Sequence, residues 1–181
     1  MEHVRWARDV AGRLLAEPLP TRWAHVQGVG HTAENIAQVV GDDAELLVCA
    51  AWLHDIGYAP NLNKVGFHPL DGARYLRDVE HADDRLTRLV ANHSCALIEA
   101  RYRDLDGDLA QEFPSPADFV LDALTFCDMT TSPTGARVDL DERLSEAFER
   151  YGDGHLVTRS LTEARPQLMA SLQRVGAALY G

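Results

Sequence analysis

The chain contains no uninterrupted apolar run of about 18 residues, the length that a membrane-spanning helix needs. Its N-terminal stretch MEHVRWARDVAGRLL is amphipathic and mixed in charge, unlike a secretory signal with a basic start and an apolar centre. Convincing apolar–polar alternation is also lacking, which argues against strands as the main element. We therefore expect a cytoplasmic protein that has no membrane partner and is built from helices.

Cysteine and basic residues are both scarce. The three cysteines, Cys49, Cys95 and Cys127, lack CxxC spacing and lie in apolar helical stretches, which excludes a disulfide framework and indicates reduced thiols. Lysine and arginine total 17 against 28 aspartates and glutamates, so the formal net charge is -11. Long-range attraction to nucleic acid or to an anionic membrane would have the wrong sign. A small anionic substrate would need cations in its binding site.

Helical periodicity, caps and breakers occur along almost the whole chain. Hydrophobic residues make up 46% of the 181 residues, enough for the core of a single domain. We predict an all-α, single-domain helical bundle with helices at residues 4–16, 22–40, 42–57, 69–79, 83–93 with an irregular continuation to 103, 115–128, 139–151 and 155–180. The expected connections are a polar loop at 58–67, a mobile loop at 104–114 and a turn at 130–137.

Local signals predict where several of these helices begin and end. Thr21 is placed to cap the second helix, and Asp42 with Glu45 has the form of a capping box. Ser115, with a proline next and an aspartate three residues on, is expected to cap another helix. Pro166 should kink or split the last helix, because it lacks a backbone N–H and its ring clashes with the preceding turn.

Six ionisable residues stand out because most of them lie in apolar surroundings: His25, His54, Asp55, His68, His93 and Asp128. Transferring such groups into a core is costly unless a partner satisfies them, and one shared cation would satisfy several. Imidazole with carboxylate suits Zn²⁺, Fe, Mn²⁺ or Ni²⁺ better than Ca²⁺, and the lack of thiolate ligands argues against a purely structural zinc site.

The His-Asp pair at 54–55 is expected in the last turn of a helix that Gly57 stops. At a helix end the backbone opens out, so that two adjacent side chains can reach one ion. Unpaired carbonyls and the negative end of the helix dipole also favour a cation there. The simpler alternative is a satisfied core histidine beside a capping aspartate.

The sequence around these residues resembles a known family. His25 lies in RWAHVQGV, His54 and Asp55 lie in WLHDIG, and Asp128 follows far downstream in FCD. This order of a histidine, a His-Asp pair and a distant aspartate resembles the motif of the HD-domain superfamily of metal-dependent phosphohydrolases. The resemblance extends over roughly residues 20–135 and implies a buried site for one or two divalent ions, of Fe, Mn, Zn, Ni or Mg.

Two further histidines are similar to those of HD proteins with two metals. The segment HPLDGA, which begins at His68, resembles their His-x-x-x-Gly-Ala element, and His93 resembles the histidine that follows it. The resemblance implies that Asp55 bridges both ions, with the remaining ligands divided between them as His25, His54 and Asp128 for the first and His68 and His93 for the second. Taken alone, the two histidines would be ordinary residues at helix ends.

The resemblance also implies a division of the chain. We expect an N-terminal packing helix at residues 1–20, the metal-binding core at 21–135 and a C-terminal helical extension at 136–181. The extension could serve as a lid, as a dimer face or as simple packing.

Other polar residues have weaker claims on the site. Many relatives carry a lysine directly after the motif glycine, and Lys64 is the candidate substitute that would contact a substrate phosphate, although a solvated loop lysine is the simpler interpretation. Arg22 could line the pocket or pair with an acid such as Asp71. His31 is expected at the surface or in a groove wall. The hydroxyls between 130 and 134 could bind an anion or form an ordinary turn.

Three functions follow from the residues and the resemblance. The first is hydrolysis of a nucleotide or another small phosphoester by a metal-activated water, with Asp55 and Lys64 as catalytic residues. The second uses the same ligands to hold two irons that activate O₂ and cleave an organophosphonate or a polyol. The third is a non-catalytic nucleotide-binding or regulatory protein. The intact ligand set argues against the third, because buried charges are costly without a metal.

Overall fold

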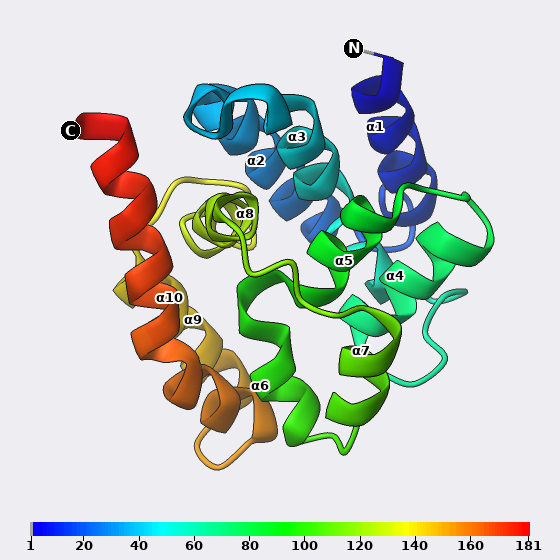
Figure 1. Ribbon diagram of the computed structural model, residues 1–181. Helices are drawn as coiled ribbons and strands as arrows, with labels where there is room; N and C mark the ends of the chain where they lie inside the picture. Colours follow the sequence, from blue (N-terminus) through cyan, green and yellow to red (C-terminus); the bar gives the residue numbers. More distant parts are fainter. Residues whose placement is uncertain (1) are drawn as a thin grey trace.

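The computed structural model describes residues 2–181 and confirms the all-α prediction (Figure 1). Within these residues no strand forms, and the β-type pairing is limited to an isolated antiparallel bridge between Thr131 and Arg137. The helices (α) and 3₁₀ turns (η) are α1 Glu2–Leu15, α2 Pro20–Ile36, η1 Ala37–Asp43, α3 Ala44–Leu53, η2 Ile56–Tyr58, α4 His68–Asp78, α5 Asp84–Asn92, η3 His93–Cys95, α6 Ala96–Arg101, α7 Asp106–Glu112, α8 Phe119–Met129, α9 Leu140–Tyr151 and α10 Leu156–Tyr180.

Helix α3 is the buried centre of the bundle. Its sequence AELLVCAAWL is apolar on every face, and every residue from Leu47 to Leu53 is buried. Helices α1, α2, α5 and α8 all contact it. A helix that is apolar all round is stable only when neighbours enclose it in this way. Since His54 follows α3 directly, the polar pair at this end lies inside the core.

Gly57 allows α4 to approach the end of α3 closely. A Cβ atom at Gly57 would lie 2.0 Å from the carbonyl oxygen of His68 and 2.6 Å from the amide nitrogen of Gly72, so no side chain fits there. The predicted helix stop at Gly57 is wrong, because α3 ends earlier and the His-Asp pair follows its last turn. The glycine is instead required where η2 packs against α4, and this contact brings His68 beside Asp55.

Helix α2 differs from its prediction at both ends. It begins at Pro20, whose fixed φ suits the first helical turn, so Thr21 lies inside the helix and does not cap it. It ends at Ile36, and the chain continues as the 3₁₀ turn η1. Gly41, with a φ of 57°, interrupts the helical backbone before α3 begins.

Arg85 explains two other errors in the predicted helix starts. The capping box at 42–45 does not form: Asp43 occupies the N-cap of α3, and its carboxylate accepts hydrogen bonds from Arg85 at 2.6 and 2.7 Å. Ser115 does not cap α8. Asp118 does so instead, and it also accepts from Arg85 at 2.9 Å. Contacts between distant segments therefore decide which acidic residue stands at each cap.

Residues 104–114 are not the predicted loop, because they contain α7. Leu109 and the following Phe113 are fully buried, and Glu112 pairs with Arg74 and Arg77 of α4. Burial and ion pairs with α4 therefore stabilise a helix that is too short to be predicted from its periodicity.

The C-terminal helices lie along one side of the bundle (Figure 1). Helix α10 contacts α8, α6 and α9. It continues through Pro166 as one helix, so the predicted split is wrong; the proline is exposed, where water can satisfy the carbonyl that its missing N–H leaves free. None of the helices described is long and apolar enough to cross a membrane.

Candidate metal centre

Three buried histidines are held in one orientation by the backbone. His25 lies in the middle of α2, His54 follows α3, and His93 follows α5. The Nδ1 atom of each ring is within hydrogen-bond distance of a backbone carbonyl oxygen, at 3.0, 2.8 and 2.6 Å respectively. When Nδ1 carries the proton and donates it there, Nε2 of a neutral ring presents a lone pair. This geometry favours the tautomer that ligates a metal through Nε2.

The first group of converging atoms belongs to His25, His54 and Asp128. Their ligand atoms all lie within 4.8 Å of one another. The Nε2 atom of His25 is 3.1 Å from Oδ1 of Asp128, and that of His54 is 4.0 Å from the same oxygen. Nε2 of His54 is buried and has no hydrogen-bond partner among the described residues. Ser94 Oγ donates to the other oxygen of Asp128 and so orients the carboxylate.

The second group belongs to Asp55, His68 and His93. The Nε2 atoms of the two histidines are 3.2 Å apart. Oδ1 of Asp55 lies 3.2 Å from Nε2 of His68 and 3.9 Å from Nε2 of His93. The ring of Tyr58 stacks on that of His68, with centroids 4.0 Å apart. Two imidazole lone pairs at this separation repel each other unless a proton or a cation lies between them.

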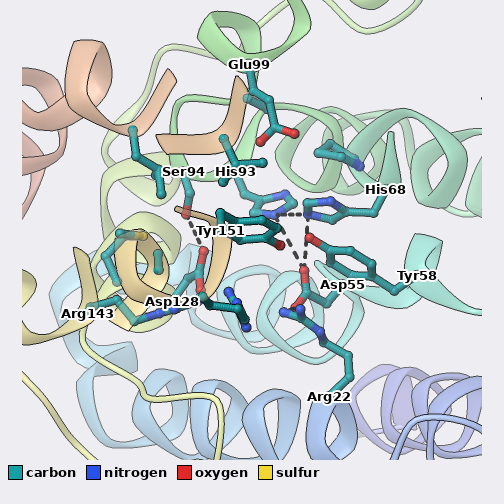
Figure 2. Close-up of a pocket in the computed structure, with 17 residues that line it drawn as sticks. Arg22, Asp55, Tyr58, His68, His93, Ser94, Glu99, Asp128, Arg143 and Tyr151 are labelled. Atoms are coloured by element: carbon teal, nitrogen blue, oxygen red, sulfur yellow. Dashed lines mark hydrogen bonds and ion pairs between the residues drawn. The ribbon is translucent and has the colours of Figure 1, made fainter. Parts of the chain in front are cut away.

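Asp55 stands between the two groups, and Figure 2 shows its carboxylate beside His68 and Arg22. Its Oδ1 atom faces the second group, whereas Oδ2 lies 3.4 Å from Nε2 of His54 and 3.7 Å from Nε2 of His25. Arg22 Nη1 also donates to Oδ2 at 2.7 Å. The alternative pairing of Arg22 with Asp71 is thus not observed. Each oxygen of this one carboxylate therefore faces a different set of imidazole nitrogens.

The protonation states of the site follow from burial and close charges. Burial raises the pKa of Asp55, but the charges of Arg22 and His54 outweigh it and hold that pKa well below its ordinary value. Burial also raises the pKa of Asp128, but the hydrogen bond with His25 and the charges of His54 and His25 lower that pKa far more. Both carboxyl groups are therefore ionised at neutral pH.

The pKa values of His93 and His54 shift in opposite directions. Burial, together with the charges of His54 and His68, lowers the pKa of His93 to about 4, so this ring is neutral at pH 7. Burial lowers the pKa of His54 as well, but the charges of Asp55 and Asp128 raise it above its ordinary value. A cation among these carboxylates would take the place of the proton that they otherwise attract to His54.

These two groups are suited to divalent metal ions. Their donors are imidazole nitrogens and carboxylate oxygens without thiolates, and the unpartnered Nε2 atom of His54 is an acceptor that a cation would satisfy. The structure thus brings all six sequence-predicted ligands together as two adjacent groups, and the predicted roles of the individual residues stay predictions.

A cavity opens beside the two groups, and its walls contain residues that the sequence patterns did not single out. It is lined by Arg22, for which the sequence left this place open, and by four residues of α9, which are Arg143, Ala147, Arg150 and Tyr151. These α9 residues lie outside the motif region, and their periodicity showed only an amphipathic helix. Tyr58, directly after the motif glycine, is a lining residue that a neighbouring motif could have indicated.

Two groups of predicted polar residues lie away from the cavity. Lys64 is exposed in the loop before α4 and does not line the cavity, so its catalytic role stays a prediction. Thr130 and Thr131 donate their hydroxyl protons to carbonyls of α8, one turn earlier. Ser132 accepts from backbone amides of its own turn. The predicted turn at 130–137 is therefore confirmed, with its hydroxyls used locally.

The chain matches the HD domain family over residues 22–123, which is more than half of its length. The matched segment contains five of the six clustered residues and ends before Asp128, which α8 brings to the others. Comparison with curated proteins and with solved structures gives no significant match. The family match and the six clustered residues agree, and the chain belongs to the HD domain family.

Proposed function

We propose that this protein is a metal-dependent phosphohydrolase that acts on a nucleotide or another small phosphoester. One observation carries the proposal: the carboxylate of Asp55 lies between two sets of imidazole nitrogens, with one oxygen facing each set. Membership of the HD domain family supports a metal-dependent hydrolase-type function.

We assign the ligands of two ions from this arrangement. His25, His54 and Asp128 would hold the first ion, His68 and His93 would hold the second, and Asp55 would be shared. When bound, two divalent ions supply Lewis-acid stabilisation of phosphoryl charge and activation of the attacking water.

The side chains around Asp55 fix the orientation in which its carboxylate would be shared by two ions. Arg22 donates to Oδ2 of Asp55 and lies over the ring of Tyr58, at 4.1 Å from its centroid. Tyr58 in turn stacks on His68. This chain of contacts fixes the carboxylate and one imidazole with respect to each other. Preorganised groups of this kind need little reorganisation when the reaction occurs.

The cavity supplies cationic groups for an anionic substrate. Arg22, Arg143 and Arg150 line it, although the whole chain carries a net charge of -11. In hydrolysis, the oxygen of water forms a bond to phosphorus, and the ester oxygen leaves with its bonding electrons. The leaving oxygen takes up a proton, so that water is divided between the two products. Guanidinium groups stabilise the charge on the phosphoryl oxygens during this step.

A second candidate keeps the same ligands but uses two irons to activate O₂. The close pair of His68 and His93, with Nε2 atoms 3.2 Å apart, favours it, because imidazole-rich sites also suit iron. Oxygen uptake that requires iron, accompanied by an iron-dependent absorbance, would support this candidate over hydrolysis.

The test is elemental analysis of protein purified without chelator, followed by a phosphoester panel with Mn²⁺, Fe²⁺, Zn²⁺ or Mg²⁺. We expect bound transition metal and phosphate release that Asp55→Asn abolishes, because this change removes the shared charge. Asp71→Asn is the matched control: Asp71 is also buried, but it accepts from the Val65 amide outside both groups, and this variant should keep its metal. Metal-free protein, or activity that persists in Asp55→Asn, would contradict the proposal.

A further inference from the structure

We propose that Arg143 of α9 binds the phosphoryl group of the substrate and restricts the enzyme to phosphomonoesters, which carry a terminal dianionic group. The inference rests on the proposed phosphohydrolase function and deepens it by naming the substrate class. Arg143 lies outside the segment that matches the HD domain family, so the family match assigns it no role.

The guanidinium of Arg143 is buried and only partly satisfied. Its side chain is 10% exposed, and Nη1 donates to Glu146 at 2.9 Å. Its Nε atom is buried and has no hydrogen-bond partner among the described residues. A buried N–H of a charged group is costly without an acceptor, so this atom indicates a binding partner that carries oxygen.

The position of Arg143 places that partner beside the metal-binding groups. Arg143 lines the same cavity as Asp55, Asp128 and Ser94, and Figure 2 shows its side chain extending toward Asp128. Arg22, the other deeply placed cation, is already paired with Asp55. Arg143 is therefore the largely buried cation of this cavity whose Nε–H has no acceptor among the described residues.

The size of the cavity favours a terminal phosphate. Its volume is about 90 Å³, the smallest among the depressions around this site. A phosphoryl group fits in such a space beside the two groups. An adjoining depression shares Arg22, Tyr58 and Arg150 with the cavity and is bordered by Pro20 and Pro133. The ester group would lie in this second space.

The number of phosphoryl oxygens distinguishes the two ester classes. A monoester has three terminal oxygens, so that two can face the metal ions while the third accepts from Arg143. A diester has two terminal oxygens, and contacts with two ions use both. Because arginine presents its N–H groups as a planar fork, it recognises phosphate oxygens in a way that lysine does not.

The experiment compares p-nitrophenyl phosphate with bis(p-nitrophenyl) phosphate and measures the affinity for inorganic phosphate by calorimetry on the metal-loaded protein. Arg143→Met should lower kcat/KM for the monoester and weaken phosphate binding by about 10- to 100-fold, as expected for loss of a hydrogen bond from a charged group. Diester turnover should change by less than about threefold, because no contact to a third oxygen is lost. Metal content should stay at the wild-type value.

Arg165→Met is the matched control. Arg165 lies in α10, pairs with Asp141 of α9 and does not line the cavity, so the same loss of charge should leave phosphate binding unchanged. If Arg143→Met does not fold, Arg143→Lys decides the question. It should weaken phosphate binding, because it keeps the charge and loses the fork.

The outcomes separate this inference from the proposed function. Unchanged phosphate affinity and an unchanged monoester-to-diester ratio in a folded Arg143 variant would overturn the role of Arg143 while hydrolysis stands. Absence of phosphoester hydrolysis with every metal, together with phosphate binding that still depends on Arg143, would overturn the function and leave the anion site in place.

Discussion

At the scale of single residues, the hydrogen bonds of the histidine ring nitrogens define the site. Three histidines direct Nδ1 to backbone carbonyls, and their Nε2 atoms then converge on carboxylate oxygens. The buried Nε2 atom of His54 has no hydrogen-bond partner among the described residues, so a cation would satisfy it. The arrangement is therefore suited to a divalent metal ion.

His68 provides the sharpest test of a second ion. We expect His68→Ala to lower the metal content from about two ions per chain to about one, because only the second group loses a donor. Elemental analysis after dialysis measures this. His31→Ala is the control, since His31 is exposed and packs edge-on against Trp52 away from both groups. Equal metal content in His68→Ala and in the wild type would remove the second site.

At the scale of helices, close backbone contacts and a few ion pairs set the geometry of the site. The contact at Gly57 sets the distance between η2 and α4, and thereby between Asp55 and His68. An ion pair and a hydrogen bond join α8 to α10. The carboxylate of Asp122 accepts from the Ser171 hydroxyl at 2.6 Å and from two guanidinium nitrogens of Arg174 at 2.6 Å each.

Gly57→Ala should destabilise the fold by about 3 kcal/mol, because the added methyl group meets backbone atoms that cannot move independently. It should also lower metal content, as α4 moves away with His68. Chemical denaturation and elemental analysis measure the two effects. Gly107→Ala in α7 is the control: its Cβ meets nothing within 4 Å, and alanine there should be neutral or stabilise by up to about 1 kcal/mol. A Gly57→Ala protein as stable as the wild type would show that the close contact is not required.

Asp122→Asn should destabilise the protein by about 1 kcal/mol at pH 7, in a pH-dependent way. Burial raises the pKa of Asp122, but hydrogen bonds from Arg174 and Ser171 outweigh it and leave the pKa below its ordinary value. The stabilisation is therefore present above the unfolded pKa of about 3.9 and is lost as the pH falls through the folded pKa.

Denaturation curves at pH 7 and at about pH 3 measure the difference for Asp122→Asn. Asp141→Asn removes a more exposed ion pair with Arg165 and should cost less than about 0.5 kcal/mol at either pH. A destabilisation by Asp122→Asn that is as large at the lower pH as at pH 7 would show that ionisation of this carboxyl group does not contribute.

At the scale of the whole molecule, the sequence predicts the helical class from its periodicity, and it predicts the six clustered residues from their apolar surroundings and from the resemblance to the HD-domain motif. The sequence does not predict helix boundaries that depend on contacts between segments far apart in the chain. Arg85 decides the acidic caps of α3 and α8, and burial of Phe113 supports the unexpected α7. Arg143 could not be assigned to the site from sequence, because no local pattern shows that α9 lines a cavity formed by residues far upstream.

The central claim is that this protein hydrolyses a phosphoester and that residues around Asp55 would hold the two divalent ions that this reaction needs. The most direct measurement is phosphate release by metal-stripped protein during titration with Mn²⁺. We predict activity that rises from zero and reaches a plateau near about two ions per chain. Full occupancy of the sites, without phosphate release from any phosphomonoester and without alcohol release from any diester in the panel, would contradict the account.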